Sequence, residues 1–375
     1  MQPSLVLGIM SGTSVDGVDY ALCETDSAGL RLRALWSAPF PRPLQCRLHD
    51  AARGEARSWE LAQLHHDLGR FYAAQARAGM RKWRVELVGL HGQTIFHQPN
   101  RKDPATLQLG EPAYLAEMLR APVVSNFRAA DLAAGGQGAP LATMFHKLVF
   151  GRRGRHVCVN NLGGISNVTS IDWRRGQEPR LLAFDTGPAN VLLDLAARKF
   201  SRDKLSCDHD GAWAAQGRPH EPLLREWLRH PFFRRKPPKS TGRELFGEPF
   251  FRNALAEVRA ARLSKFDVLA TLTAFTARSL TLNYRKHLPA LPDVIVLTGG
   301  GAANSALRAN IQAELQQLKP TAQVQTSEDY GWPLQSVEPA AFALLASLRL
   351  QGRSGNLPQT TGAKRPVLLG QITAP

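Results

Sequence analysis

The most informative stretch of this sequence is Leu7-Gly8-Ile9-Met10-Ser11-Gly12-Thr13-Ser14-Val15-Asp16-Gly17-Val18-Asp19. An apolar run leads into it and an alternating run leads out, so we predict a β-hairpin with a turn rich in Gly, Ser, Thr and Asp. Such a turn offers backbone N–H groups to an anion, and Asp16 and Asp19 could hold a divalent cation through water. The alternative is a tight turn that needs its glycines for backbone reasons alone.

Composition indicates a folded chain. Of its 375 residues, 43% are apolar and 21% charged, which suits one large domain or two of ordinary size. The net charge of +16 raises the question of a nucleic-acid partner. The basic residues are spread widely, without interleaved aromatic residues, so we expect a solvated basic surface and no nucleic-acid partner. The sequence assigns no role to the basic segment 234–243.

Cysteine spacing and the N-terminus bear on the compartment. Cys23, Cys46, Cys158 and Cys207 are far apart, which favours free thiols in a reducing compartment over a zinc site. The N-terminus has no export-signal pattern, and the apolar stretch 268–277 is too short to span a bilayer. We therefore expect a cytoplasmic protein without membrane attachment.

A second hairpin is predicted where the strand 156–160 runs into the Gly/Ser/Asn-rich stretch 161–169. Both hairpins follow the scheme strand, glycine-rich turn, strand, and each stands near the start of one half of the chain. We infer a two-lobed α/β protein built from related halves. The expected N-terminal lobe comprises 1–127 and 347–375, and the expected C-terminal lobe comprises 128–346.

Asp185 is the candidate general base. It ends the predicted strand 181–184 and is followed by Thr-Gly-Pro, and ligands of α/β sheets bind beyond the carboxyl ends of strands. An aspartate stays ionised near neutral pH unless it is strongly desolvated, as a base requires. The alternative is that Asp185 caps the helix expected to begin near Pro188.

Two further segments complete the pattern. The predicted strand 293–297 runs into Gly299-Gly300-Gly301 and a helix over 304–318, a turn against which a base or ribose could lie. Its spacing matches neither a Rossmann fingerprint nor a P-loop. Glu338 begins a predicted helix with proline in its first turn.

The order of these motifs resembles that of the actin, sugar-kinase and heat-shock-chaperone ATPase superfamily, and within it the chain closely resembles the anhydro-N-acetylmuramic acid kinase family. The motifs that carry the resemblance lie at 8–19, 91–94, 126–128 with Asp131, 133–141, 161–167, 184–188, 299–302 with Asn304, and 338–343. They cover almost the whole chain. Two residues depart from the pattern: Ala189 stands where glycine is expected, and Pro339 where alanine is expected.

The resemblance implies a two-lobed actin-like ATPase (ribonuclease H-like) fold, each lobe a mixed sheet flanked by helices, with the active site in the interlobe cleft. It also implies a kinase that uses ATP and Mg²⁺ to open the 1,6-anhydro ring of 1,6-anhydro-N-acetylmuramic acid and to phosphorylate O6. The products would be N-acetylmuramic acid 6-phosphate and ADP, in peptidoglycan recycling and amino-sugar degradation. The enzyme would be a homodimer in the bacterial cytoplasm.

Site roles follow from the same resemblance. Asp185 is expected to activate the attacking water, and Glu338 to help position it. Expected ATP-binding residues are Gly12, Thr13, Ser14, Val15, Asp16, Gly17, Val18, Asp19, Asn161, Gly163, Gly164, Gly299, Gly300, Gly301 and Asn304. Expected substrate-binding residues are His91, Gln93, Thr94, Asn126, Arg128 and Asp131. Asp16 and Asp19 are the candidate metal-binding residues.

Arg128 could hold the lactyl carboxylate of the sugar, because a guanidinium fork matches a carboxylate. A structural ion pair with Asp131 explains it equally well.

Three other classes of protein were weighed against these motifs. A glycoside hydrolase could use Asp185 with a second carboxylate, but it would not need two phosphate-type hairpins. An actin-like scaffold would share the fold, yet it would give His91, Gln93 and Arg128 no reason to converge. A nucleic-acid binder would show binding that depends steeply on salt.

Overall fold

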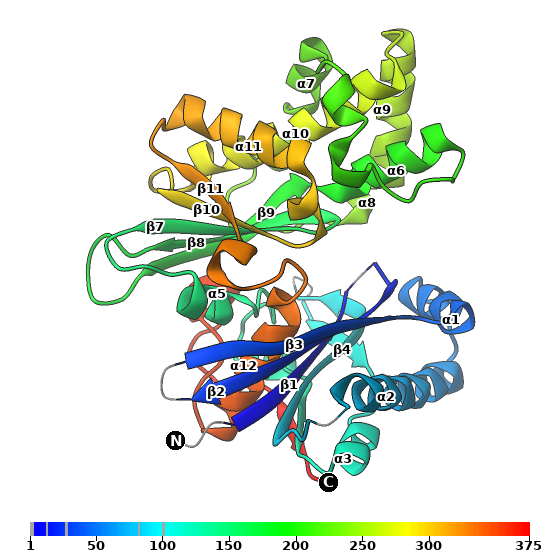
Figure 1. Cartoon of the computed structure of the whole chain (residues 1–375), viewed down its shortest axis with the longest axis vertical. Helices are drawn as coiled ribbons and strands as arrows, with labels where there is room; N and C mark the ends of the chain where they lie inside the picture. Colours follow the sequence, from blue (N-terminus) through cyan, green and yellow to red (C-terminus); the bar gives the residue numbers. More distant parts are fainter. Residues whose placement is uncertain (1–3, 13, 27–28, 82, 100–101) are drawn as a thin grey trace. The chain divides into compact units, whose positions relative to one another are not determined.

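The computed structural model describes residues 4–12, 14–26, 29–81, 83–99 and 102–375. The chain forms two compact units (Figure 1), which we call unit 1 (Met1–Phe145 with Gln335–Pro375) and unit 2 (His146–Leu334). Unit 1 thus includes residues 128–145 and 335–346, which were expected in the C-terminal lobe. The reason is packing, because the helix that begins at Val337 lies on the sheet of unit 1.

The sheet of unit 1 has seven strands in the order β12-β6-β4-β1-β2-β3, with β5 paired to β4. Their bounds are β1 Ser4–Ser11, β2 Gly17–Asp26, β3 Gly29–Pro39, β4 Leu87–Gln98, β5 Ala105–Leu109, β6 Val123–Ser125 and β12 Gln371–Thr373. Strands β1, β2 and β3 are antiparallel neighbours. On its other side β1 pairs in parallel with β4, which pairs in parallel with β6.

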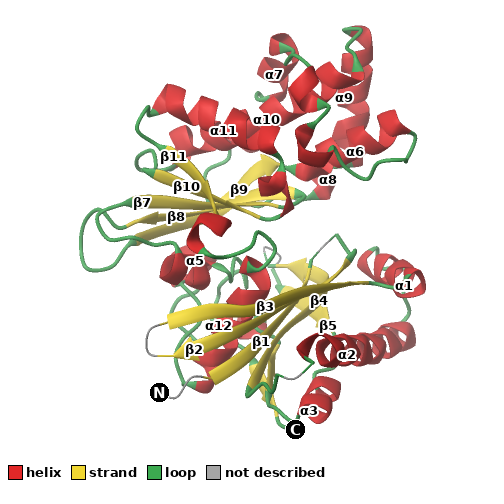
Figure 2. Ribbon diagram, viewed as in Figure 1, coloured by secondary structure: helices red, strands yellow, loops and turns green. Residues whose placement is uncertain are grey.

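The sheet of unit 2 has the order β11-β10-β7-β8-β9 (Figure 2). Its strands are β7 His156–Leu162, β8 Ile165–Asp172, β9 Arg180–Pro188, β10 Val294–Thr298 and β11 Gln323–Thr326. Strands β7, β8 and β9 are antiparallel, and β7 continues in parallel to β10 and β11. The same topology therefore occurs in both units, and it is the ribonuclease H-like arrangement. This confirms the expected pair of related mixed sheets flanked by helices.

The helices of unit 1 cover its sheet. They are α1 Arg42–Ala52, α2 Ser58–Met80, α3 Ala113–Leu119, α4 Ala129–Ala133, α12 Val337–Leu350 and α13 Pro358–Thr361, and α5 Thr143–Val149 runs across the boundary between the units. Helix α12 lies so close to β1 and β4 that a Cβ on Gly8 would stand 1.8 Å from the carbonyl oxygen of Pro339. Pro339 itself lies in the first turn of α12, where no helical hydrogen bond from its nitrogen is lost.

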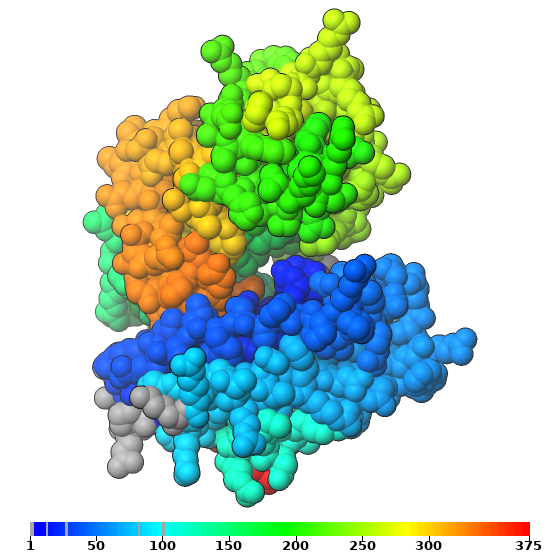
Figure 3. All heavy atoms as spheres, turned by 45° about the vertical axis from the view of Figure 1, so that its right-hand side comes forward, coloured from blue at the N-terminus to red at the C-terminus, as the bar shows by residue number. Residues whose placement is uncertain are grey.

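Unit 2 carries more helix around a smaller sheet. Its helices are α6 Asn190–Ser201, α7 Glu221–Trp227, α8 Arg243–Phe246, α9 Glu248–Ala260, α10 Lys265–His287 and α11 Ser305–Leu318, with short 3-10 turns at 209–211, 214–216, 231–234, 300–303 and 327–330. The part from α7 to α9 forms a broad surface of this unit (Figure 3). Beneath it, aromatic side chains including Trp227, Phe232 and Phe275 form a buried cluster.

Helix α10 is buried on almost every side, including its polar residues Thr271, Ser279 and Asn283. The cysteines carry free thiols. No helix in the described ranges is both long enough and apolar enough to cross a membrane.

Candidate active site

The first hairpin joins β1 to β2, and side chains from elsewhere in unit 1 hold its turn. Gln93 donates from Nε2 to the carbonyl oxygen of Gly12 at 3.1 Å, and Gln45 donates to that of Val15 at 2.8 Å. Within the turn, Ser14 Oγ donates to the Asp16 carboxylate at 2.8 Å. Thr13, expected to bind ATP, lies outside the described residues.

The glycines of this hairpin fall into two kinds. A Cβ on Gly17 would stand 2.6 Å from the carbonyl oxygen of Ala38, so the packing of the protein excludes a side chain there. Among the described residues, a Cβ on Gly12 would meet only Ser14 Oγ, at 3.6 Å, which is ordinary contact. The neighbouring protein therefore does not require glycine at position 12, whereas it does at position 17.

Asp16 and Asp19 are the candidate metal residues. Burial raises the pKa of Asp19, a hydrogen bond from Ser37 opposes that shift, and the negative charge of Asp16 adds to it. A cation beside the two carboxylates would relieve this repulsion. Among the described residues no three His, Cys, Asp or Glu side chains gather to hold an ion by themselves. The pair therefore fits Mg²⁺ only if water and phosphate oxygens complete its coordination.

In unit 2 the second hairpin and the glycine-rich turn lie side by side. Asn161, at the end of β7, pairs with Thr298 at the end of β10, so the turns 163–164 and 299–301 follow neighbouring strand ends. The carbonyl oxygen of Gly163 accepts from the backbone N–H of Asn190 at 3.0 Å, and that of Gly164 accepts from Ala189 at 3.0 Å. The backbone at the start of α6 thus holds this turn.

The same two kinds of glycine occur here. Cβ atoms added to Gly163, Gly164 and Gly300 would meet nothing closer than 3.6, 3.9 and 3.9 Å. Gly299 has a φ of +77°, which other residues rarely adopt, and a Cβ on Gly301 would stand 2.8 Å from the Cβ and 2.9 Å from the carbonyl oxygen of Leu162. The fold therefore requires glycine at both positions. Asn304 caps α11, accepting from the N–H of Leu307 at 2.9 Å.

Asp185 lies near the end of β9, half-buried, and it does not cap a helix. Helix α6 begins only at Asn190, and no side chain caps it. The Asp185 carboxylate instead accepts from the N–H of Thr241 at 2.8 Å. The capping alternative is therefore wrong.

Burial raises the pKa of Asp185 to about 7, the Thr241 hydrogen bond opposes the rise, and the charge of Glu244 adds to it. We expected an aspartate that stays ionised near neutral pH. Desolvation therefore brings the titration of this carboxyl close to neutral pH.

His91 and Arg128 meet inside unit 1. His91 Nδ1 is 2.7 Å from the carbonyl oxygen of Gly92, and Nε2 is 2.9 Å from Arg128 Nη2. Only a neutral ring protonated on Nδ1 can make both contacts. Burial and the nearby Arg128 charge hold the pKa of His91 well below its usual value, in agreement with that tautomer.

Arg128 is not fully satisfied by the protein. Its Nη1 donates to the carbonyl oxygen of Gly138 at 2.7 Å, but its buried Nε has no partner among the described residues. Burial lowers its pKa to about 10, and the charge of Glu338 opposes that shift. The side-chain oxygen of Gln93 is likewise buried without a partner in the described part of the chain.

Asp131 makes no ion pair with Arg128. It is fully buried, and its carboxylate accepts from the N–H of Gly138 at 2.7 Å, Asn356 at 2.8 Å and Thr361 at 2.7 Å. These contacts anchor the C-terminal segment to α4. These three contacts give Asp131 a structural role, and its expected contact with substrate stays a prediction.

The remaining expected residues of unit 1 are Thr94, Asn126 and Glu338. Thr94 accepts from Gln108 at 3.3 Å, and Asn126 adopts a positive φ of 54°. Glu338 is exposed in the first turn of α12. Glu338 belongs to unit 1 and Asp185 to unit 2, so the two expected catalytic carboxylates come from different units.

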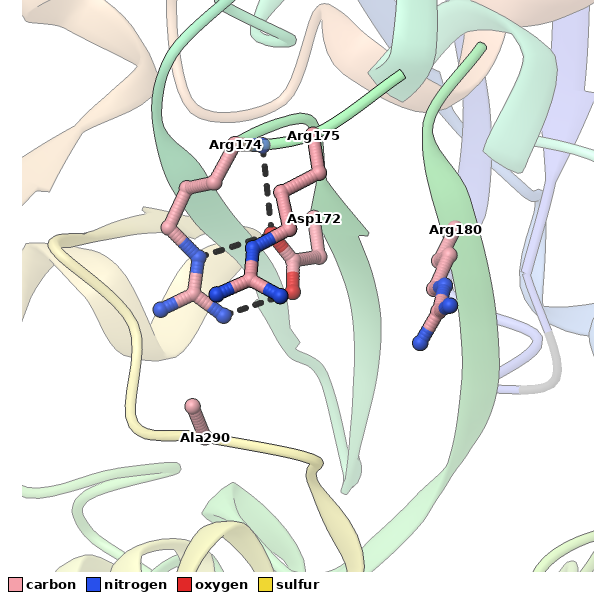
Figure 4. A pocket seen from close by; sticks show the side chains of 5 residues that line it. All are labelled: Asp172, Arg174, Arg175, Arg180 and Ala290. Atoms are coloured by element: carbon pink, nitrogen blue, oxygen red, sulfur yellow. Dashed lines mark hydrogen bonds and ion pairs between the residues drawn. The ribbon is translucent and has the colours of Figure 1, made fainter.

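A basic pocket of about 370 Å³ lies at the other end of the unit 2 sheet (Figure 4). Asp172 and Arg180, which line it, pair across β8 and β9 at the end opposite Ile165 and Pro188. Arg174 contacts both oxygens of Asp172, at 2.8 and 2.6 Å. The pocket is therefore remote along the strands from Asp185 and from both glycine-rich turns of this unit.

Comparison with known proteins identifies the family. The family model described as anhydro-N-acetylmuramic acid kinase matches residues 4–375. An anhydro-N-acetylmuramic acid kinase of Picosynechococcus is 43% identical over 99% of this chain and 99% of its own. One of Acaryochloris marina is 43% identical over 98% and 99%.

Among solved structures, the activator of the 2-hydroxyisocaproyl-CoA dehydratase from Clostridium difficile, with bound ADPNP, aligns with a TM-score of 0.46. It is 11% identical over 91% of this chain and 94% of that one, a likeness too distant to bear on function. The family model and the curated relatives, in contrast, match along nearly the entire chain. The chain therefore belongs to the anhydro-N-acetylmuramic acid kinase family, whose members are kinases of cell-wall sugar metabolism.

Proposed function

We propose that the protein uses ATP to convert 1,6-anhydro-N-acetylmuramic acid into N-acetylmuramic acid 6-phosphate and ADP. Water adds to C1, the bond between C1 and O6 breaks, and O6 takes the γ-phosphoryl group. The proton that water loses passes to a base. Family membership supports the kinase chemistry, and the site geometry described above supports the residue roles.

The observation that carries the proposal is the set of glycines that packing does not explain. Gly12, Gly163, Gly164 and Gly300 all stand in turns at strand ends, and within the described part of the chain a Cβ on any of them would meet only ordinary contacts. Glycine at such positions lets phosphate, base or ribose approach the backbone closely. A glycoside hydrolase needs no such turns, so this pattern favours the kinase.

Phosphoryl transfer needs positioning and neutralisation of charge more than covalent help. The two hairpins would supply backbone N–H groups to the phosphates. Mg²⁺, held near Asp16 and Asp19 through water, would neutralise phosphate charge. The hairpins belong to different units, and we propose that each of them contributes phosphate contacts.

Asp185 is the proposed base. The Thr241 N–H fixes one of its carboxylate oxygens, which leaves the other to accept a proton from water. Its pKa of about 7 matches the working range of a base at neutral pH. Glu338, from unit 1, is proposed to help orient the water.

Arg128 is the proposed partner of the lactyl carboxylate. Its buried Nε lacks an acceptor in the described structure, and a carboxylate would supply one. The neutral His91 ring holds the guanidinium in place by accepting from Nη2. Gln93, which ties the first hairpin through Nε2, has a free oxygen for a sugar hydroxyl. A homodimer in the bacterial cytoplasm stays a prediction.

The test is an ATP-consumption assay with anhydro-N-acetylmuramic acid, with glucose, and without sugar. We expect strong stimulation by the anhydro sugar alone. Running the reaction in ¹⁸O-water and analysing the sugar phosphate by mass spectrometry tests the ring opening, because the label should enter at C1 and not in the phosphate. Equal stimulation by both sugars would refute the substrate, and label in the phosphate would refute the proposed order of bonds.

A further inference from the structure

The basic segment 234–243 contains one residue unlike the others. Arg234, Arg235, Lys236 and Arg243 are exposed, whereas Lys239 is only 8% exposed. An ammonium group is rarely buried unless polar groups compensate the lost water. The contacts of Lys239 therefore indicate what its burial achieves.

Those contacts lead to the residue after Asp185. Lys239 Nζ donates to the side-chain oxygen of Asn283 at 2.5 Å, and it lies 4.5 Å from the centre of the Phe232 ring. With its oxygen engaged in this way, Asn283 donates from Nδ2 to the carbonyl oxygen of Thr186 at 2.8 Å. Lys239 thereby fixes the amide that holds the end of β9.

The same short segment also holds Asp185 directly. The backbone N–H of Asp185 donates to the carbonyl oxygen of Lys239 at 3.1 Å, and the N–H of Thr241 donates to the Asp185 carboxylate at 2.8 Å. One segment therefore contacts both the backbone and the side chain of Asp185. Its own anchor in the core of unit 2 is the buried Lys239 side chain.

The charges around the pair act in opposite directions. Glu244 on α8 disfavours the ionised form of Asp185, and Lys239 favours it. Burial lowers the pKa of Lys239 to about 8, and the charges of Lys286 on α10 and of Arg235 lower it further. The charge of Asp185 opposes this shift. His287, also on α10, lies 3.4 Å from Nζ. Lys239 and Asp185 therefore each favour the ionised form of the other.

We propose that Lys239 is a positioning residue for Asp185: it anchors the segment 239–241 that orients the carboxylate, and its ammonium group compensates the carboxylate charge. This inference rests on the proposed role of Asp185 as the base. Removing Lys239 should lower kcat and leave the KM for ATP little changed, because its side chain contacts Asn283, Phe232 and His287. The acidic limb of the kcat–pH profile should also move toward higher pH.

The experiment compares Lys239→Met, Lys239→Arg and the matched control Lys236→Met, which removes an exposed charge from the same segment. For each variant kcat and KM are measured from pH 5.5 to 9, beside the melting temperature. For Lys239→Met we expect kcat to fall by roughly 10- to 100-fold, the range that misplaced reacting groups produce. Its acidic limb should move up by about one pH unit, as loss of a neighbouring opposite charge implies. Lys239→Arg should restore the position of the limb, and Lys236→Met should behave as the parent.

The inference is overturned if Lys239→Met has the same kcat and pH profile as Lys236→Met. It is also overturned if Lys239→Met lowers kcat without moving the acidic limb of the profile. A third contrary result is an acidic limb that moves as far in Lys239→Arg as in Lys239→Met. If Lys239→Met does not fold, Lys239→Arg alone decides, because a limb displaced by about one unit despite the retained charge contradicts the proposal. The variant Asp185→Asn distinguishes a failure of the proposed base from a failure of the proposed role of Lys239. If that variant stays active, the base assignment fails; if it is inactive while Lys239→Met behaves normally, only the role of Lys239 fails.

Discussion

The two units share one strand order, but they hold their glycine-rich hairpins differently. In unit 1, the backbone N–H of Phe40 binds the turn 12–16 at Asp16, and the side chains of Gln45 and Gln93 bind it at Val15 and Gly12. In unit 2, backbone groups of Ala189 and Asn190 bind the turn 163–164. A turn that depends partly on side chains can be loosened by single substitutions, whereas contacts made by backbone alone are part of the fold. The comparison therefore predicts that single substitutions weaken the phosphate contact of unit 1 more easily than that of unit 2, the unit that carries the proposed base.

The largest expected effect comes from the base in unit 2. Asp185→Asn should lower the single-turnover rate at saturating ATP and sugar by about 10²–10⁴-fold, the usual worth of general-base catalysis. Asp194→Asn is the matched control, because it removes a second half-buried carboxylate of unit 2, with its pKa raised by burial to about 6. A rate for Asp185→Asn above about a tenth of the parental rate would count against the base.

The glycine contrast gives the next effect. Gly163→Ala and Gly12→Ala should weaken ATP binding on the order of 10-fold, because overpacking by one methyl costs upwards of about 1 kcal/mol. Their melting temperatures should stay near that of the parent. Gly17→Ala should instead lower the melting temperature, because its Cβ would overlap the carbonyl oxygen of Ala38. Calorimetric titration with a non-hydrolysable ATP analogue measures the first effect. If alanine lowers stability equally at all three positions, the distinction between the two kinds of glycine is lost.

The contribution of side chains to the phosphate-binding turn of unit 1 can be tested at Gln93. Gln93→Leu removes the hydrogen bond to Gly12 and should raise the KM for ATP by roughly 5- to 10-fold, the worth of about one hydrogen bond. Gln45→Leu, which removes the corresponding bond to Val15 but has no unpartnered buried oxygen, is the companion variant. Because the proposed site uses the Gln93 oxygen for the sugar, only Gln93→Leu should also raise the KM for the anhydro sugar. Identical effects of the two variants on both constants would remove Gln93 from the sugar site.

A separate expected effect is a dependence of stability on pH. The pKa of Asp185 rises from 3.8 to about 7 on folding. Between these values the folded state holds a proton that the unfolded state has lost, so this carboxyl's contribution to stability declines as pH rises toward 7. Asp185→Asn cannot ionise, and its melting temperature relative to the parent should therefore increase from pH 5 to pH 8. A constant difference across that range would show that Asp185 is not appreciably desolvated. In the parent, kcat should rise with pH up to about 7 and then level off, because the base must be ionised.

Local patterns predicted much of this molecule. Each hairpin, the end of β9 and the turn 299–301 are marked by glycines and polar residues within a few positions of an apolar strand. The expected boundary between the lobes was wrong because it depends on where α12 packs, and its first residues gave no local sign that they lie on β1 and β4. The role of Asp131 was missed for a similar reason, since Asn356 and Thr361 lie far along the chain.

Lys239 and Thr241 were missed as well. They follow Asp185 by more than fifty positions in a segment whose composition indicates only a basic surface. A single proline-flanked lysine among exposed basic residues gives no sign of burial. Only the fold brings that segment against β9, where its backbone pairs with Asp185.

The two kinds of glycine have a consequence for how such a protein would drift if selection for its chemistry were relaxed. Gly17, Gly299 and Gly301 would be retained, because the fold itself would select against any side chain there. Gly12, Gly163, Gly164 and Gly300 would be free to change, because only a bound ligand would forbid it. A relative that keeps the first group and has lost the second would then be recognisable, from sequence alone, as a folded descendant that no longer binds a nucleotide.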